Sequence, residues 1–429
     1  MKKLLTATFA LLLAHSALAG VKIEHWVSPS GAKVYFVESR VLPMLDVQVD
    51  FIAGSMFDPA GKSGVAALTR GSLDLGAAER DETAIAEQLA DIGANLSGGA
   101  DTDRSSVSVR TLSARDKRDP ALETLRAVIQ QPRFDAAIFE REQGRTIAGL
   151  KEAMTQPASI AGKAFWAALY PTHPYGQQAT PESVAAVTRD DLVAFHARYY
   201  TASNASITLV GDISRSEAEK IAETLVAKLP KGEAITLPNA PQAPKGGDIK
   251  LPHPASQAHV YIGLPAIERG NPDFFPLVVG NYTLGGGGFV SRLMKEVRDK
   301  RGFAYSVYSY FAPMRQPGPF QIGLQTKRSQ AKDAIKVTRE VLAGFLKTGP
   351  SEEELAAAKA NLTGSFPLRL DSNKKILDNV TMIAFYGMPL DYLDHYQAKV
   401  QAVTAEDVKQ AFARRVRPAD LITVTVAAD

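Results

Sequence analysis

Residues 284–310 have the sequence LGGGGFVSRLMKEVRDKRGFAYSVYSY, in which three parts follow one another. The first is a run of four glycines, Gly285, Gly286, Gly287 and Gly288. Apolar residues then recur at helical spacing, which predicts a short amphipathic helix, at Phe289, Val290, Leu293, Met294 and Val297. After a break at Arg301-Gly302, aromatic and β-branched residues predict a strand over residues 303–310. Because glycine permits close backbone approach and a helix start has unpaired N–H groups, the glycine run is a candidate ligand-binding loop.

The pattern GGGFxSRLxxExRxKxGxAYSV within this stretch closely resembles the C-terminal domain of the pitrilysin/insulinase class of zinc peptidases. These are the inverzincins, which include the mitochondrial processing peptidase. In that family, an Arg and a Tyr seven residues apart hold substrate for a zinc site in the other domain, and a glycine-rich loop binds substrate. The resemblance implies these roles for Arg298, Tyr305 and the glycine run.

Simpler interpretations exist for each of these residues. Arg298 would lie in the last turn of its helix, where a cation interacts favourably with the helix dipole. Tyr305 is a good strand former that is often part of a core. The glycine run could be only a flexible turn. A phosphate-binding loop is disfavoured, because the dinucleotide-binding motif would need glycine at Val290 and because no lysine of a Walker motif follows the glycines. The seven-residue spacing behind the glycine run favours the substrate-binding interpretation.

The chain begins with features of an export signal. Residues 1–19 contain two lysines, an apolar core and a small-x-small ending, which predicts a signal peptide cut before Gly20 and a soluble periplasmic protein. A retained N-terminal anchor is the alternative. The chain has no cysteine, so neither disulfides nor thiol chemistry is available. A formal charge of +3 gives no electrostatic footprint for nucleic acid.

The sequence divides into two similar halves. Residues 230–254 contain six prolines and little apolar periodicity, which predicts an exposed, stiff linker between domains at 20–229 and 255–429. On either side, segments correspond at an offset of about half the chain; Val187–Leu192, for example, parallels Val403–Val408. Self-similarity at this period indicates a duplication.

Each half is predicted to contain both strands and helices. In the first half, strands are expected at 34–38, 45–53 and 105–111, and helices at 63–74, 81–92, 121–130 and 134–153. This order predicts an α+β fold. With the resemblance, it implies two homologous α/β-sandwich domains forming a clamshell, each with a mainly antiparallel sheet covered by helices. Residues 173–176, HPYG, follow the family's N-terminal half closely.

The zinc-binding residues of the family are missing. Catalytic zinc needs three protein ligands and an open position for water. The inverzincin motif is H-x-x-E-H on a helix, with a further Glu as third ligand. Aligned on Gly64, the motif positions are Ala67, Arg70 and Gly71, and the third ligand falls at Gly149. No such motif occurs elsewhere, so we expect no metal or other cofactor in this chain.

Two functions remain open. The first is a non-catalytic subunit of an exported heterodimeric zinc metallopeptidase, active as an endopeptidase only with a zinc-bearing homologous partner that binds the zinc. Arg298 and Tyr305 would stabilise the transition state of a peptide substrate at the partner's zinc. The second is a catalytically inert peptide-binding or scaffold protein of the same fold, which would bind extended peptides at a sheet edge. The retained Arg/Tyr pair and glycine run favour the first.

Overall fold

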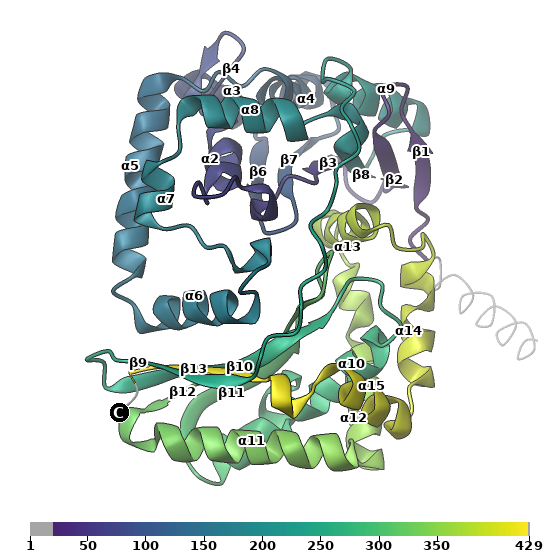
Figure 1. Ribbon diagram of the computed structural model, residues 1–429. Coiled ribbons are helices and arrows are strands. Elements are labelled where there is room, and N and C mark those ends of the chain that lie inside the picture. Colours follow the sequence, from purple (N-terminus) through teal and green to yellow (C-terminus); the bar gives the residue numbers. More distant parts are fainter. Residues whose placement is uncertain (1–19, 428–429) are drawn as a thin grey trace, which may run out of the picture.

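The computed structural model describes residues 20–427, so the expected signal peptide at residues 1–19 lies outside the described part of the chain (Figure 1). The first half is built on a six-stranded sheet in the order β1-β2-β8-β3-β7-β6. Only β2 and β8 run parallel; the other neighbours are antiparallel. The strands are β1 (Glu24–Val27), β2 (Lys33–Glu38), β3 (Met44–Phe51), β6 (Asn95–Ala100), β7 (Ser105–Leu112) and β8 (Ala205–Gly211). A small hairpin joins β4 (Gly76–Ala77) and β5 (Arg80–Asp81).

The first half contains eight described helices, and the four predicted ones correspond to α2, α3, α4 and α5. The eight are α2 (Val65–Ser72), α3 (Glu82–Ile92), α4 (Arg115–Gln130), α5 (Ala136–Ala153), α6 (Pro157–Leu169), α7 (Pro181–Ala185), α8 (Arg189–Tyr199) and α9 (Arg215–Val226). One start differs: α4 begins six residues before the predicted Ala121 and contains Pro120. Its early turn is held by Arg118, which donates to Glu217 of α9 over 3.0 Å. Because this partner lies in α9, the local sequence did not indicate it.

The second half repeats the sheet of the first. Its order is β11-β12-β10-β13-β9, with β9 and β13 parallel and the remaining neighbours antiparallel. The strands are β9 (Gly247–Leu251), β10 (Gln257–Ile267), β11 (Ala304–Phe311), β12 (Gly318–Lys327) and β13 (Ile422–Val426). Position by position, β9, β13, β10, β12 and β11 correspond to β2, β8, β3, β7 and β6. The strand order therefore agrees with a duplication. The α+β class with mainly antiparallel sheets is confirmed.

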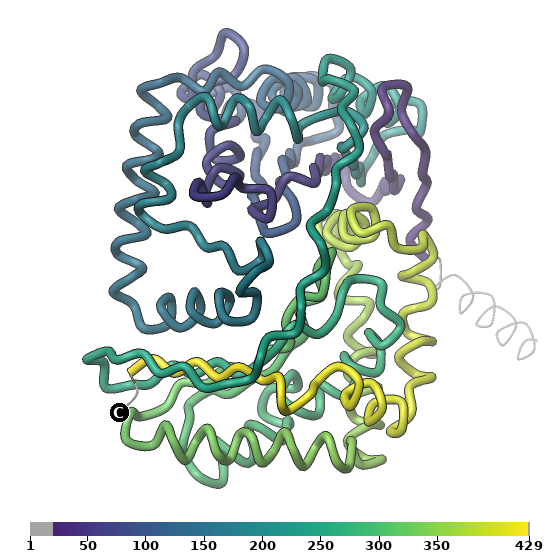
Figure 2. The backbone as a smooth tube through the Cα atoms, viewed as in Figure 1, coloured from purple at the N-terminus to yellow at the C-terminus, as the bar shows by residue number. Residues whose placement is uncertain are grey.

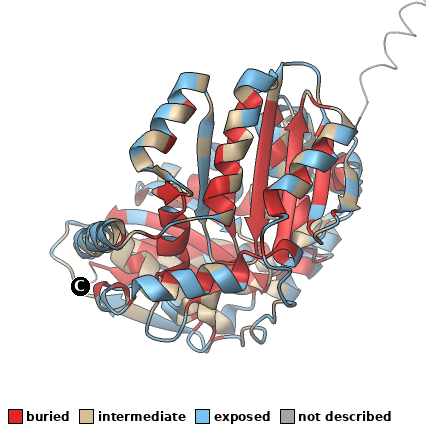
Figure 3. Cartoon of the chain, turned by 90° about the horizontal axis from the view of Figure 1, so that it is seen from above, coloured by how far each residue is buried: buried red, intermediate tan, exposed pale blue. Residues whose placement is uncertain are grey.

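The proline-rich segment is irregular only up to residue 246. Its end forms β9, which pairs with β13 over five residues and is the counterpart of β2. The remaining helices are α10 (Phe274–Asn281), α11 (Ala331–Thr348), α12 (Glu352–Gly364), α13 (Asn373–Tyr386), α14 (Tyr392–Ala402) and α15 (Ala405–Arg415). Figure 3 shows that the strands are largely buried while most helices have one buried and one exposed face. Within residues 20–427, no helix combines the length and the apolar character needed to cross a membrane.

Each half contributes one helix to the sheet of the other half. Helix α6 packs on β10 and β13, and helix α13 packs on β8, β3 and β2 (Figures 1 and 2). The first contact is a small core in which Phe165 and Leu169 meet Ile422 and Val424. The second is formed by Tyr35, Val37, Val210, Leu377, Val380 and Ala384. These two apolar contacts join the two halves.

Candidate functional site

The glycine run packs tightly against β11. A Cβ on Gly285 would lie 2.6 Å from the backbone nitrogen of Ser309. A Cβ added to Gly286 would crowd Asn281, and one added to Gly287 would crowd Tyr282. Gly288 has no such crowding but has a φ of +60°, a left-handed conformation that side chains disfavour. A flexible turn would have neither constraint. The four glycines are therefore required by the conformation of this loop.

Hydrogen bonds fasten the start of this loop to the strand. Asn281 Nδ2 donates to the carbonyl of Ser309 over 2.9 Å, and Ser309 Oγ donates to Asn281 Oδ1 over 2.6 Å. The reciprocal pair connects the end of α10 to the middle of β11. The position of the loop is thus set by a strand more than twenty residues away.

The expected amphipathic helix is replaced by irregular helical turns. The π-helical turns η4 (Tyr282–Gly286) and η6 (Met294–Asp299) flank the 3₁₀ turn η5 (Gly288–Val290). Leu293 and Val297 are buried as the spacing predicts, but Phe289 and Val290 are exposed, Phe289 by 69%. The prediction of one apolar face was therefore wrong at its first turn, because the glycine loop turns that segment away from the core. π-Helical turns occur frequently at functional sites.

Arg298 and Tyr305 come together in the structure, with Phe289 as a third member. The guanidinium carbon of Arg298 lies 5.9 Å from the ring centroid of Tyr305 and 5.0 Å from that of Phe289. Arg298 also pairs with Asp299 over 2.9 Å. Tyr305 is 88% exposed, so it is not part of the core. We call Phe289, Arg298 and Tyr305 the Arg/Tyr cluster.

An irregularity in β11 explains the exposure of Tyr305. The pairing of β11 with β12 shifts between Ala304 and Val307, so Tyr305 and Ser306 have no partner in the register. Such a bulge re-aims side chains and is common beside functional sites. Ala304 and Val307 stay buried on either side, and the tyrosine turns outward.

The four degenerate zinc-site positions lie on two neighbouring helices. Ala67, Arg70 and Gly71 are on α2, Gly149 is on α5, and the two helices pack together. Ala67, Gly71 and Gly149 are exposed. A Cβ added to Gly71 or Gly149 would meet no atom within 4 Å. The positions predicted for the ligands therefore hold small, exposed residues on two helices that contact each other.

Arg70, which the sequence predicts at the position of the family's catalytic Glu, has a structural role. Its side chain is buried, its Nε donates to the carbonyl of Ser106 over 2.6 Å, and its Nη2 donates to the carbonyl of Ser97 over 2.9 Å. It also pairs with Asp74 over 3.4 Å. These bonds connect α2 to β7 and to the edge strand β6.

The residues at these positions do not fit a zinc ion. None of the four carries an imidazole, thiolate or carboxylate, and the guanidinium of Arg70 would repel a divalent cation. Within residues 20–427, no group of three or more His, Cys, Asp or Glu side chains is placed to hold a metal ion. The helix itself is still capped, because Asp58 accepts hydrogen bonds from the backbone of Gly64 and Ala66, both over 2.7 Å.

A buried polar cluster between the halves was not anticipated. Asp103, in the turn between β6 and β7, accepts hydrogen bonds from Tyr175 Oη (2.5 Å), Tyr386 Oη (3.0 Å) and the backbone nitrogen of Arg315 (2.8 Å). Burial, with the nearby Asp103 carboxylate, raises the pKa of both tyrosines above the usual range. The partners lie 72 to 283 residues away in sequence, so no local pattern indicates the cluster.

Comparisons with known proteins agree with this geometry. Residues 36–181 match the family described as "Insulinase (Peptidase family M16)", and residues 186–362 match "Peptidase M16 inactive domain". The "Non-peptidase homolog YmxG" of Helicobacter pylori is 26% identical over 89% of this chain and 88% of its own.

Solved structures show the same relationship. A "peptidase M16 inactive domain" from Pseudomonas fluorescens is 39% identical, with a TM-score of 0.92 over 95% of this chain and 98% of that one. The periplasmic protease PqqL of Escherichia coli is 16% identical with a TM-score of 0.80; it matches 95% of this chain, which covers 45% of PqqL. Both halves of the duplicated fold and the 39% identical structure lead to one conclusion: this chain belongs to the M16 (insulinase) peptidase family.

Proposed function

We propose that this chain is the non-catalytic subunit of an exported heterodimeric zinc metallopeptidase. It supplies the Arg/Tyr cluster and the glycine loop, while a homologous partner supplies the zinc. The observation that carries the proposal is the pairing of Arg298 with the almost fully exposed Tyr305. Tyr305 adds nothing to the core, and the bulge in β11 presents its ring and hydroxyl to solvent beside Arg298.

The chemistry of the cluster suits peptide hydrolysis in a shared site. Attack on a peptide carbonyl develops negative charge on its oxygen, and a positioned hydroxyl or guanidinium stabilises that charge. Zinc in the partner would activate the water. The glycine run, Gly285 to Gly288, would hold the substrate backbone. Helix α2 supports a site shared between two subunits, because its residues Ala67, Arg70 and Gly71 provide no zinc ligand.

Two further features support a non-catalytic, exported subunit. The Helicobacter pylori relative is called a non-peptidase homologue, and the structurally similar PqqL is a periplasmic protease. Residues 1–19 have the composition of a signal peptide. We infer that the mature chain begins at Gly20 and acts in the periplasm.

Reconstitution with a zinc-bearing homologue tests the proposal. Mixing the two purified subunits is expected to produce peptidase activity that is absent from each alone. In the complex, Tyr305→Phe keeps the ring and removes the hydroxyl, so we expect turnover to fall about 10²- to 10³-fold. If Arg298 binds the substrate carbonyl in the ground state, Arg298→Ala will raise KM more than it lowers kcat.

Lys295→Ala is the matched control, because Lys295 is an exposed cation in the same helical segment without a side-chain partner among the described residues. Arg301 is unsuitable, since it binds the carbonyl and carboxylate of Glu296. Size exclusion checks that each variant still forms the complex. The shared-site proposal fails if the homologue is equally active without this chain, or if both site variants keep near-wild-type rates.

The scaffold function is favoured by one observation. Strand β6 is one of the two edge strands of the first sheet, and Arg70 fixes its backbone through the carbonyl of Ser97. A rigid open edge can accept an extended peptide as an added strand. This second candidate predicts that the chain binds unfolded peptides with similar affinity before and after Tyr305→Phe.

A further inference from the structure

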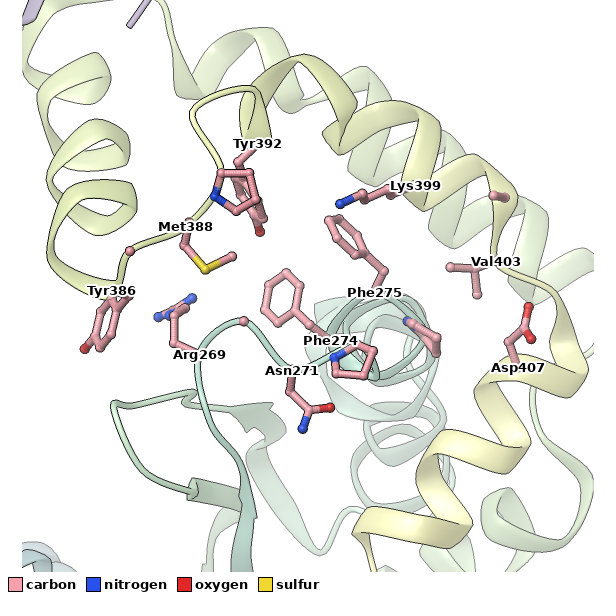
Figure 4. A pocket seen from close by; sticks show the side chains of 16 residues that line it. Arg269, Asn271, Phe274, Phe275, Tyr386, Met388, Tyr392, Lys399, Val403 and Asp407 are labelled. Carbon is pink, nitrogen blue, oxygen red and sulfur yellow. The ribbon is translucent and has the colours of Figure 1, made fainter. Parts of the chain in front are cut away.

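A separate pocket lies in the second half, between the start of α10, the loop after α13 and helix α14 (Figure 4). Its volume is about 640 Å³, within the ordinary range for small-molecule sites. Much of its lining is apolar or aromatic, including Phe274, Phe275, Met388 and Tyr392. None of the residues in the Arg/Tyr cluster or at the degenerate zinc-site positions contributes to it.

Arg269 lines this pocket and has no anionic partner among residues 20–427. Its guanidinium makes no hydrogen bond or ion pair with any described residue, and its Nε is buried without a partner. Its guanidinium carbon lies 5.2 Å from the ring centroid of Tyr386, which also lines the pocket. A desolvated cation without a counter-charge is costly, and burial lowers the pKa of Arg269 accordingly.

The surroundings of Arg269 add positive charge. Arg315 lies with its guanidinium carbon 5.7 Å from the Tyr386 ring, and it too has a buried Nε without a partner. Asp103 is the carboxylate that attracts both arginines electrostatically. Its oxygens, however, already accept hydrogen bonds from two tyrosines and a backbone N–H. The local charge therefore favours an anion.

Another cationic side chain lies at the rim of the pocket. Lys399, on α14, has its Nζ 5.5 Å from the ring centroid of Phe275, and it makes no ion pair with a described residue. Figure 4 shows Arg269 beside Tyr386 and Met388, and Lys399 on the other side of the Phe274 ring. The one carboxylate in the described lining, Asp407, is engaged at the backbone and hydroxyl of Thr404.

We propose that this pocket binds a small organic monocarboxylate with an aromatic or branched apolar body. The carboxylate pairs with Arg269, the apolar body packs against Phe274, Phe275 and Met388, and Lys399 adds attraction at the rim. A guanidinium matches a carboxylate in geometry and charge. A free carboxylic acid and the C-terminal residue of a short peptide share this chemistry.

Calorimetry on the whole mature chain tests the assignment with 3-phenylpropanoate and its neutral amide. The acid is expected to bind about 10- to 100-fold more tightly than the amide, because only the acid forms the charge-assisted hydrogen bonds. The dipeptide glycylphenylalanine and its C-terminal amide distinguish the two sources. A dipeptide acid that binds more tightly than the free acid indicates a peptide C-terminus; the reverse order indicates a free acid.

Three variants locate the site. Arg269→Gln is expected to bring the acid-to-amide ratio close to one, and Lys399→Met to lower it by a smaller factor. Arg369→Gln is the matched control, because Arg369 also faces an aromatic ring, Tyr396 at 5.5 Å, but lies outside the pocket. It should leave the ratio unchanged.

Three results overturn the proposal. They are equal binding of acid and amide by the wild type, no binding of the acid at millimolar concentration, and an unchanged ratio in Arg269→Gln. If Arg269→Gln does not fold, Lys399→Met and the wild-type comparison of acid with amide still decide, since Lys399 is exposed and makes no ion pair with a described residue.

Discussion

Gly285 and Gly288 occupy the same glycine run but are glycines for different physical reasons. A Cβ on Gly285 would meet the backbone of Ser309, which cannot move without disturbing β11, whereas Gly288 needs only its left-handed backbone. We expect Gly285→Ala to displace the loop and to lower the melting temperature clearly. Gly288→Ala should cost about 1–2 kcal/mol, the strain of the left-handed conformation. Thermal unfolding of both variants measures the difference; equal effects would show that crowding is not what selects Gly285.

We expect Asp50 to make the free energy of unfolding depend on pH. It is fully buried in β3, accepts a hydrogen bond from Gln48 over 2.8 Å, and lies 3.4 Å from Arg104. Burial, the dominant cause, raises its pKa from 3.8 to about 6. The folded state therefore holds this proton more tightly than the unfolded state does. The stabilisation is present below pH 3.8 and is lost as pH rises through about 6.

The variant Asp50→Asn isolates this pH dependence, because the other carboxylates titrate alike in both proteins. We expect the melting temperature of the wild type, relative to Asp50→Asn, to fall between pH 4 and pH 7. Melting curves for the two proteins across this range provide the comparison. A constant difference would show that Asp50 titrates as an ordinary exposed carboxyl group.

At the scale of elements, the two exchanged helices hold the halves together. Phe165 of α6 is fully buried, and its ring centroid lies 5.6 Å from that of Tyr261 on β10. We expect Phe165→Ala to destabilise the chain by about 3–5 kcal/mol, the usual cost of removing a buried phenyl ring. Because that loss falls on the contact between halves, cleavage of the irregular segment at 230–246 by a protease should also become faster.

Leu368→Ala is the control for that experiment, since Leu368 is 63% exposed and its loss should change stability by no more than about 0.5 kcal/mol. Melting temperature and cleavage rate are measured on the same samples. A Phe165→Ala variant that melts like Leu368→Ala would mean that α6 contributes little to the association of the halves.

At the scale of the whole molecule, the chain is expected to fold without a metal. The positions predicted for the family's zinc site hold Ala67, Arg70, Gly71 and Gly149, and none of these side chains is a zinc ligand. Metal analysis after dialysis should find far less than one zinc per chain, and a chelator should leave the melting temperature unchanged. About one tightly held zinc per chain, with chelator-sensitive peptidase activity, would contradict this expectation.

The agreement between sequence and structure is best where the signal is local. The strand at 105–111 and the helix at 81–92 were predicted within about a residue, because alternation and helical spacing report which side of an element is buried. Arg298 and Tyr305 were predicted as a pair from the family resemblance of their motif, and the two side chains lie close together in the structure. Phe289 was missed as a member of the cluster, because its spacing is equally typical of a core residue.

The sequence by itself determined the duplication and the α+β class, since these depend on self-similarity and short-range periodicity. The loss of the zinc ligands and the Arg/Tyr pair were predictions from the resemblance of short motifs to the family. Only the tertiary structure decided the exchange of α6 and α13 between the halves, the use of Arg70 as a link to β6 and β7, and the positive charge of the pocket at Arg269. Each of these depends on which groups distant in the chain share a buried contact. Burial and the pairing of charges are properties of that packing, and no window of sequence contains them.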